Sequence, residues 1–411
     1  MSSPIIVGID IGTTKICTLI ARVESDGRIR ILGVGLEPSQ GIRKGTVVDL
    51  EAASQAVAHS IDKAERTSGL EITSALVSMA GSHVSSINSR GVAGIHGQVV
   101  DERDVLRAMD AAQAVAIPHN REIIHVIQRG FTVDGQDGIR MPIGMHGYRM
   151  EVEAHIITAA ASTVDNLRLV VGESGVGISQ FVLNPLASAE VVLTKTEREM
   201  GVVVCDVGGG TTDMAIYIEG DVYHTMVLAV GGNHVTSDIA HGLRLPFSRA
   251  EDIKINHGHS LTREINSMET FPVKTFGEGG AADVSRMELV HIIEARVEEI
   301  FALIQQEIKR SGYDGLLPAG LVLTGGSSLL PGIASLAGEV MGLPARVAQP
   351  SNLVGMVDKL HSPAFSTSVG LVQWAAMMNE VDPVASRKSF IPSQNGSNWG
   401  RVRDMLKRLL P

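Results

Sequence analysis

Cysteines and aromatic residues are scarce in this sequence. The 411 residues include two cysteines, and aromatic side chains make up 3% of the chain. Cys17 and Cys205 both lie in apolar runs, which favours small buried side chains in a reducing compartment over a disulfide scaffold or reactive thiols. With 44 glycines and a hydrophobic share of 44%, the composition is typical of an α/β protein, and a chain of this length predicts more than one domain.

Long apolar runs and long basic runs are also absent. No apolar stretch approaches the ~18 to 20 residues that a membrane-spanning helix requires, and the N-terminal residues lack the pattern of a signal peptide. The formal net charge is -10, and Lys and Arg form no long run outside the final residues, so nucleic acid is not expected as a partner. We therefore expect a cytoplasmic protein that does not cross a membrane by itself.

Hydrophobic periodicity outlines several helices and strands. Apolar runs next to polar turns predict strands at 5–9, 15–23, 202–205 and 214–218. Asp101 and Asp104 favour the start of a helix, because they stand three residues apart before an apolar pattern of helical spacing. A long helix is expected from 285 to 312, with one apolar face that packs in a core. That face consists of Leu289, Ile292, Ile293, Val297, Ile300, Phe301, Ile304 and Ile308.

Two similar polar turns stand nearly half the chain apart. The first is DIGTTK at 10–15, and the second is DVGGGTTD at 206–213. Backbone N–H groups and hydroxyls in such turns can bind phosphate oxygens, and the aspartate can hold a metal ion through water. Glycines let the backbone approach a phosphate without a Cβ in the way. The repetition predicts two related lobes with a nucleotide between them.

A third motif completes the pattern. The run LVLTGGSSLLPG at 321–332 places two glycines after a short strand, where they can lie beneath an adenosine, and a Walker A sequence is absent. The three motifs, in this order, resemble those of the actin, heat-shock chaperone and sugar kinase superfamily. That resemblance implies an ATP site in which Asp10 and Asp206 hold Mg²⁺ mainly through water and Lys15 contacts a phosphate. The residues expected to bind the cofactor are Asp10, Gly12, Thr13, Thr14, Lys15, Asp206, Gly208, Gly209, Gly210, Thr211, Thr212, Gly232, Glu251, Lys254, Gly325, Gly326 and Ser327.

Two positions near this site have alternative interpretations. By the resemblance Glu251 and Lys254 line the adenosine pocket, although on a helix they could instead form an i, i+3 ion pair. In several actin relatives a Glu or Gln near LNPLASAE orients the attacking water, whereas the comparable position here is Asn184 or lies beside Pro185. We therefore expect weak or no ATPase activity, and no residue is assigned a catalytic role.

Across essentially its whole length the chain resembles the FtsA family of bacterial cell-division proteins. The resemblance is carried by VGIDIGTTKICTLI at 7–20, LNPLASAEVVL at 183–193, DVGGGTTDMAIY at 206–217, GGNHVTSDIAHGL at 231–243 and an amphipathic segment at the C-terminus. It implies an α/β, two-lobed actin-like fold with an inserted small α+β subdomain and a C-terminal amphipathic helix. The expected parts are the first lobe at 1–84 and 162–195, completed by 366–380; the inserted subdomain at 85–161; the core of the second lobe at 196–227 and 311–365; its outer subdomain at 228–310; a flexible linker at 381–397; and a membrane-binding helix at 398–411.

The C-terminal segment 398–410 has the pattern of an amphipathic helix. At ~1.5 Å per residue it is about 20 Å long, which is too short to span a bilayer but suits its interface. Packing onto the protein itself is the alternative, because amphipathic helices usually face a core. The residues expected to meet an anionic membrane are Trp399, Val402, Leu406, Leu409 and Leu410 on the apolar side, with Arg401, Arg403, Lys407 and Arg408 as basic contacts.

The family resemblance also implies partners. The protein is expected to polymerise and to tether the tubulin-like division protein FtsZ to the cytoplasmic face of the membrane at the septum. The C-terminal peptide of FtsZ is expected on 228–310, where Arg296 is a candidate contact or a solvated helix charge, and other division proteins are expected on 85–161. Two other functions are considered. A small-molecule kinase would need a carboxylate base, and neither it nor a pilus-assembly relative would need the terminal amphipathic helix.

Overall fold

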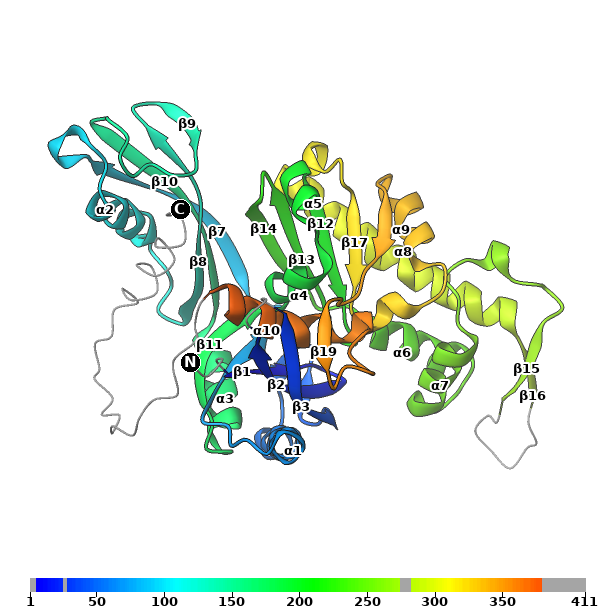
Figure 1. The fold of residues 1–411 in the computed structure, drawn as a ribbon. Helices are drawn as coiled ribbons and strands as arrows, with labels where there is room; N and C mark the ends of the chain where they lie inside the picture. Colours follow the sequence, from blue (N-terminus) through cyan, green and yellow to red (C-terminus); the bar gives the residue numbers. More distant parts are fainter. Residues whose placement is uncertain (1–4, 25–27, 274–281, 379–411) are drawn as a thin grey trace.

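Two mixed sheets of similar topology organise the protein (Figure 1). The computed structural model describes residues 5–24, 28–273 and 282–378. In each half of the chain, three consecutive antiparallel strands continue into parallel neighbours. The first sheet has the order β11-β6-β1-β2-β3-β19, made of β1 (Ile5–Ile11), β2 (Lys15–Val23), β3 (Ile29–Pro38), β6 (Ser74–Met79), β11 (Gly177–Leu183) and β19 (Leu353–Gly355). The second has the order β14-β13-β12-β17-β18, made of β12 (Val202–Val207), β13 (Thr212–Ile218), β14 (Asp221–Leu228), β17 (Leu321–Thr324) and β18 (Ala345–Val347).

The strands predicted on either side of the two polar turns are confirmed. β1 pairs with β2 and β12 pairs with β13, so that each turn closes an antiparallel hairpin. These strands are almost entirely buried, as their near-continuous runs of Val and Ile require. Both cysteines lie within them and are fully buried, and this burial raises the pKa of the Cys17 thiol to about 12. The prediction that both thiols are buried is therefore confirmed.

Helices pack on the first sheet, and two further helices lie between the two sheets. α1 (Leu50–Ser68) and α3 (Ala161–Gly172) belong to the first lobe, whereas α4 (Asn184–Val192) and α10 (Ser366–Met377) pack together between the sheets (Figure 1). The contact between α4 and α10 is close, because a Cβ added at Gly370 would lie 2.0 Å from the Ala187 carbonyl oxygen. A side chain at this position would therefore push the two helices apart.

A separate small sheet is inserted after β6. It has the order β7-β10-β8-β9, made of β7 (Ser85–Gly94), β8 (Arg121–Val133), β9 (Gln136–Ile139) and β10 (Arg149–Ala160), and α2 (Glu102–Gln113) packs on it. The predicted start of α2 is confirmed, because Asp101 accepts from the Asp104 N–H and the Asp104 carboxylate accepts from the Asp101 N–H. In Figure 1 this sheet stands apart from the rest of the first lobe, beside β14 of the second.

The remaining helices extend the second lobe. α8 (Arg286–Ser311) carries the predicted apolar stripe, and its members are buried except Ile292, which is partly buried. The other helices are α5 (Lys195–Met200), α6 (Gly232–Gly242), α7 (Phe247–His257) and α9 (Ile333–Met341). The short elements are β4 (Ile42–Arg43), β5 (Thr46–Val47), β15 (Thr270–Val273), β16 (Ala282–Ser285), and the 3-10 turns η1 (His96–Gln98), η2 (Thr262–Glu264), η3 (Asp314–Leu316), η4 (Gly326–Leu329) and η5 (Pro363–Phe365).

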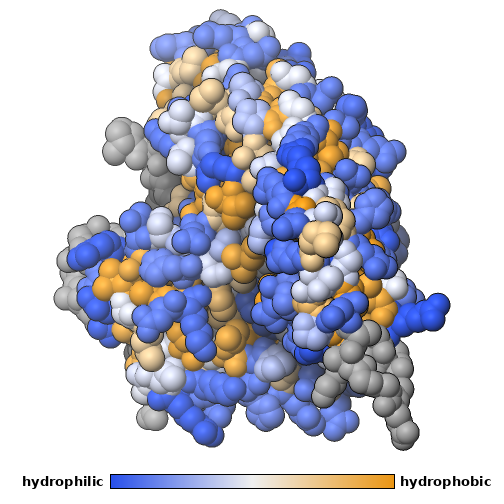
Figure 2. Space-filling model, turned by 90° about the vertical axis from the view of Figure 1, so that its right-hand side faces the viewer, coloured by the Kyte–Doolittle hydropathy of each residue, from blue (hydrophilic) through white to orange (hydrophobic). Residues whose placement is uncertain are grey.

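The surface on the side of α7 and β15 is mostly hydrophilic, and hydrophobic residues gather in the hollow at its centre (Figure 2). Within the described residues, no helix is both long and apolar enough to cross a membrane. The predicted linker at 381–397 and the predicted membrane-binding helix at 398–411 lie outside the described residues.

A buried histidine joins the inserted sheet to the second lobe. His155 of β10 is 1% exposed, and its Nδ1 lies 2.6 Å from Asn88 Oδ1 while its Nε2 lies 3.0 Å from Thr225 Oγ1. This set suits a neutral ring that donates through Nδ1 and accepts through Nε2. Nearby, the guanidinium carbon of Arg129 lies 3.7 Å from the centre of the Tyr223 ring. Burial, with smaller contributions from His224 and Arg129, lowers the pKa of His155 to about 3.

We expect His155 to make the protein less stable in acid. Since its pKa in the folded chain lies below the usual value of 6.5, the stabilisation is complete above pH 6.5 and is lost as the pH falls towards 3. The loss has a slope of at most about 1.4 kcal/mol per pH unit, the value for one proton. Urea unfolding of the wild type and of His155→Gln between pH 7 and 4 measures it. Stability of the His155→Gln variant should change less with pH, whereas exposed His119→Gln should follow the wild type; identical slopes for His155→Gln and wild type would contradict the assignment.

Candidate functional site

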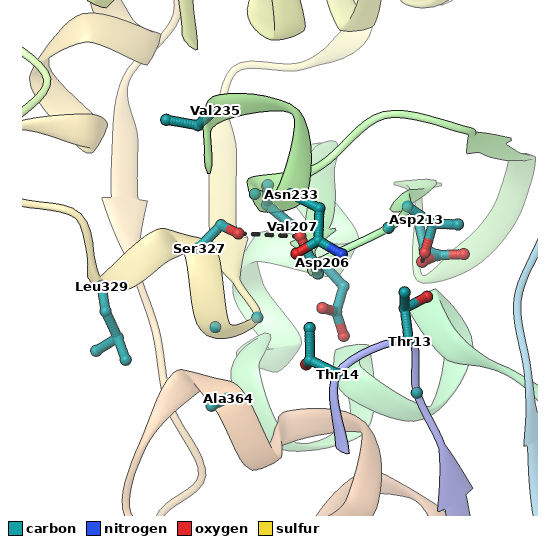
Figure 3. Close-up of a pocket in the computed structure, with 18 of the residues that line it drawn as sticks. Thr13, Thr14, Asp206, Val207, Asp213, Asn233, Val235, Ser327, Leu329 and Ala364 are labelled. Atoms are coloured by element: carbon teal, nitrogen blue, oxygen red, sulfur yellow. Dashed lines mark hydrogen bonds between the residues drawn. The ribbon is translucent and has the colours of Figure 1, made fainter. Parts of the chain in front are cut away.

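A cavity of about 370 Å³ lies between the two lobes, where both polar turns and the third motif meet (Figure 3). The structure brings nearly all of the predicted site residues to its wall. Those that line it are Asp10, Gly12, Thr13, Thr14, Lys15, Asp206, Gly208, Gly209, Gly210, Thr211, Gly232, Glu251, Lys254, Gly325, Gly326 and Ser327. Thr212 does not line it, because its fully buried hydroxyl donates to the Val230 carbonyl at 2.8 Å.

The first turn holds its aspartate with hydroxyl groups and a nearby lysine. Asp10 is 4% exposed, and Ser78 Oγ donates to its Oδ1 at 3.0 Å. The same Ser78 oxygen accepts from the Ile11 N–H at 2.9 Å, which ties β6 to the end of β1. Lys15 Nζ lies 3.9 Å from Asp10 Oδ2 and donates to the Ala364 carbonyl at 2.5 Å. The turn therefore presents a buried carboxylate next to a cation.

The second turn is built from backbone hydrogen bonds. The Gly208 N–H donates to the Thr211 carbonyl at 2.9 Å, and the Asn233 N–H donates to the Gly209 carbonyl at 2.8 Å. Ser327 Oγ donates to the Gly208 carbonyl at 2.9 Å and so connects the third motif to this turn (Figure 3). Asp206 is 7% exposed, and burial raises the pKa of its carboxyl to about 6. Because burial makes the charge of Asp206 less favourable than that of a surface carboxylate, Asp206 gains more from a bound cation.

The turns of the two lobes touch each other. A Cβ added at Gly209 would lie 2.4 Å from Thr14 Cγ2, and one added at Gly210 would lie 2.6 Å from Thr13 Oγ1. In Figure 3, Thr13 and Thr14 lie opposite Asp213 and Asp206. The absence of a side chain at Gly209 and Gly210 therefore lets the two turns approach each other this closely.

The third motif completes the wall beside the second turn. Gly325 has a φ of +85°, and a Cβ added there would lie 2.4 Å from Asp206 Oδ1. Lys254 Nζ lies 2.7 Å from Glu251 Oε2 and 2.8 Å from Thr236 Oγ1. Burial lowers the pKa of Lys254 although Glu251 opposes this. The ion pair and the cavity-lining position, which were alternatives in the sequence, therefore occur together.

A buried carboxylate was missed by the sequence analysis. Asp213 is 2% exposed and lines the cavity directly across the hairpin from Asp206, with which it pairs in register. Its Oδ2 accepts from Thr211 Oγ1 at 2.8 Å, but its Oδ1 has no hydrogen-bond partner. Burial, followed by the charge of Asp206, raises the pKa of Asp213 well above its ordinary value. The available signal was the register of the hairpin, because paired residues point to the same face.

Apolar residues also line the cavity, and none of them was predicted from the sequence as a site residue. Val297, Ile300 and Phe301 of α8 line the cavity although the sequence placed them only in a core. Asn184 also lines it, and its Oδ1 is buried with no partner. Arg296 lies outside the cavity and pairs with Asp238, 3.1 Å from Nη2 to Oδ1, and with Glu299, 2.5 Å from Nη1 to Oε2.

These groups can accommodate an elongated ligand with a charged and an apolar end. The hydroxyls and glycine N–H groups of two facing turns suit phosphate oxygens, and the apolar wall with the glycine pair suits a flat ring. The unpartnered Asp213 oxygen and the carboxylates of Asp10 and Asp206 suit a hydrated divalent cation. The residues present therefore fit a nucleotide with Mg²⁺.

The contact between the two turns can be tested with an added methyl group. We expect Gly209→Ala to weaken nucleotide binding about tenfold or more, because overpacking costs typically ~1–3 kcal/mol and opening the lobes relieves it. Adding Thr14→Ser removes the opposing methyl group and should restore much of the affinity. Gly130→Ala, which meets no atom within 4 Å, is the matched control. Calorimetric titration with ATP and Mg²⁺ measures all four proteins; full affinity in Gly209→Ala alone would show that the lobes are not in contact in the bound state.

Two family models match the chain. The model described as cell division protein FtsA matches residues 203–370, and the model of the SHS2 domain inserted in FtsA matches residues 81–158. The FtsA of Pseudomonas aeruginosa is 41% identical over 373 residues, which cover 91% of this chain and 89% of that protein. The FtsA of Borreliella burgdorferi is 42% identical over 398 residues, which cover 96% of each chain.

Solved structures of low sequence identity share the fold. The PilM-PilN type IV pilus biogenesis complex has a TM-score of 0.64 at 15% identity, over 92% of this chain and 99% of that chain. MreB 5 of Spiroplasma citri bound to AMPPNP has a TM-score of 0.57 at 15% identity, over 92% and 98%. A MamK double helical filament has 0.53 at 12% identity, over 90% and 98%. The predicted actin-like fold with its inserted subdomain is confirmed, and the sequence relatives show that the chain belongs to the FtsA family of cell division proteins.

Proposed function

We propose that this protein binds ATP and Mg²⁺ between its lobes, assembles into filaments and links FtsZ to the cytoplasmic face of the membrane at the division septum. The observation that carries the proposal is the cavity in which Asp10 and Asp206 approach from opposite lobes, in a chain of the FtsA family. In this role the protein is an adaptor of the division ring, and the nucleotide sets the shape of its two lobes.

The phosphates and the adenosine of the nucleotide would lie at different ends of the cavity. Asp10 and Asp206 would hold Mg²⁺ through water, Lys15 would contact a phosphate, and the glycine N–H groups would bind phosphate oxygens. At the other end Glu251 and Lys254 would reach the adenosine. A bound Mg²⁺ would neutralise part of the phosphate charge. MreB 5 of Spiroplasma citri has the same fold and was solved with AMPPNP, which supports this assignment.

Turnover of the nucleotide should be slow. Asn184 stands at the first turn of α4 beside the cavity, and an amide is no base. Asp213 is another candidate to orient a water molecule, but burial and the charge of Asp206 raise its pKa and so favour its protonated form, which is no base. ATP would therefore act mainly by closing the cleft, which suits an assembly protein better than a metabolic enzyme.

The protein would assemble with itself, and its partners would bind different subdomains. The MamK double helical filament shares this fold, which supports self-assembly. FtsZ would dock through its C-terminal peptide on 228–310, where Arg296 is a contact already oriented by Asp238. Other division proteins would bind the inserted subdomain at 85–161. The lobes would comprise 1–84, 162–195 and 366–380 on one side and 196–227 and 311–365 on the other.

Membrane attachment would depend on 398–411, reached through the linker at 381–397. The segment combines apolar residues with Arg401, Arg403, Lys407 and Arg408, whereas the whole chain has a net charge of -10. Each basic residue near an anionic surface contributes roughly 1 kcal/mol. One such helix binds weakly, but many helices on one filament bind by avidity, so that assembly and attachment are coupled.

The nucleotide assignment is tested by Asp206→Asn, which keeps the size of the side chain and removes its charge. We expect the affinity for ATP in the presence of Mg²⁺ to fall at least tenfold, about 1.4 kcal/mol, because a carboxylate is needed to hold the hydrated cation. Calorimetry gives the affinity and thermal unfolding checks the fold. Asp314→Asn, at an exposed 3-10 turn of the same lobe, is the control. Wild-type affinity in Asp206→Asn would remove Asp206 from the metal site.

Membrane attachment is tested by sedimentation with anionic vesicles, with and without ATP. Trp399→Glu and Leu406→Glu should each release the protein from the vesicles, because a charge on the apolar face opposes burial in the interface. Their affinity for ATP should stay at the wild-type value. Ser397→Glu adds the same charge outside the helix and should sediment as the wild type does. Undiminished vesicle binding in both face variants would exclude this segment as the anchor.

A further inference from the structure

Three consecutive hydroxyl residues at the start of α10 reach three different strands of the cavity. Ser366, Thr367 and Ser368 are each at most 5% exposed. Ser366 Oγ lies 2.6 Å from Thr324 Oγ1 of β17. Thr367 Oγ1 donates to Asp206 Oδ2 of β12 at 2.6 Å, and Ser368 Oγ donates to Asp10 Oδ2 of β1 at 2.6 Å. One helical turn thus contacts the strands that lead into all three motifs.

Helix geometry explains how neighbours in sequence can do this. Successive side chains point about 100° apart around a helix, so Thr367 and Ser368 face different directions. α10 lies between the two sheets, where the ends of β1 and β12 approach it from opposite lobes (Figure 1). The two acceptors are 161 and 358 residues away in sequence from their donors. The arrangement is therefore a tertiary one and not a local cap.

These hydroxyls do not cap α10, because its N-cap position is Phe365 and the three hydroxyl residues follow it inside the first turn. Here Thr367 and Ser368 instead donate to the carboxylates of Asp206 and Asp10, which are buried at 7% and 4% exposure. A buried carboxylate needs donors to be stable as an anion, and the hydroxyl bond of Thr367 opposes the effect of burial on the pKa of Asp206.

We propose that Thr367 and Ser368 are positioning residues of the Mg²⁺-nucleotide site, which hold the carboxylates of Asp206 and Asp10 in the orientation that a hydrated cation requires. The inference rests on the proposed function. Each carboxylate oxygen can accept more than one hydrogen bond, so the hydroxyl occupies one direction and leaves others for metal-bound water. Both donors belong to one helix, so the carboxylates of the two lobes are oriented by the same rigid element.

The test separates a positioning role from a structural one by its dependence on Mg²⁺. ATP affinity is measured calorimetrically with excess Mg²⁺ and again with EDTA, and the ratio gives the gain due to the cation. Thr367→Val keeps the shape of the side chain and removes its donor, and Ser368→Ala removes the other donor. We expect each to reduce the gain about tenfold, the size of one hydrogen bond to a charged group, with a smaller change in EDTA.

Two further variants serve as controls. Thr367→Ser restores the hydroxyl and should recover the Mg²⁺-dependent gain. Ser366→Ala removes a hydroxyl that is bonded to Thr324 and to neither aspartate, so it should keep the gain even if it lowers thermal stability. Should Thr367→Val fail to fold, Ser368→Ala tests the loss of a donor by itself, with Ser366→Ala as its matched control.

The outcomes separate the positioning role from the proposed binding of ATP. In one outcome, the wild type binds ATP more tightly with Mg²⁺, and Thr367→Val and Ser368→Ala both retain this gain in affinity. That result would overturn the positioning role and leave the nucleotide site intact. Loss of the gain in Ser366→Ala as well would show a general effect of the buried hydroxyls and would also overturn it. Wild-type protein with no affinity for ATP would overturn the proposed function, and the positioning role with it.

Discussion

The structure depends on holding two buried carboxylates, one from each lobe, next to each other. Asp10 and Asp206 end the first strand of each hairpin, and the charge of Asp10 adds to the effect of burial on the pKa of Asp206. Burying like charges is unfavourable unless donors or cations offset it. The fold supplies Lys15, Ser78, Thr367 and Ser368 around them. The unfavourable energy that is left would be relieved by a bound cation, so the same interaction that limits stability of the empty cleft favours its closure on a ligand.

The two hairpins share a plan but differ at one position. Asp206 pairs across its hairpin with Asp213, whereas Asp10 pairs with Cys17. Paired residues of this kind point to the same face. The second lobe therefore presents two carboxylates where the first presents one carboxylate and a thiol, whose pKa burial raises to about 12. Lys254 of the second lobe is paired with Glu251, so the excess of acidic side chains on the cavity wall still lies on the second lobe, whereas Lys15 of the first lobe lies beside Asp10.

The sequence predicted the elements that depend on local pattern. The hairpin strands follow from Val and Ile runs, and the start of α2 follows from the spacing of Asp101 and Asp104. It did not predict features that depend on which way a side chain points. Thr211 and Thr212 are neighbours, yet Thr211, directly before β13, lines the cavity, whereas the hydroxyl of Thr212 donates to the Val230 carbonyl. The roles of Thr367 and Ser368 depend on acceptors hundreds of residues away, which no local pattern encodes. The stripe on α8 was correctly placed in a core, but that core also forms a wall of the cavity.

Besides the contacts at the polar turns, two further contacts connect the halves of the chain and limit how they can move. The first is the crossing of α4 and α10, where the absence of a side chain at Gly370 lets the backbones meet. The second is the contact of the inserted sheet with β14, through His155 and Thr225. α10 extends from the carboxylates to Trp374, whose ring meets that of His125 on β8 at 5.6 Å. His125 Nε2 in turn accepts from the Leu183 N–H directly before α4. Because packed helices and sheets move as rigid bodies, a rotation of the lobes about the α4–α10 crossing would also have to break or shift the contact between His155 and Thr225.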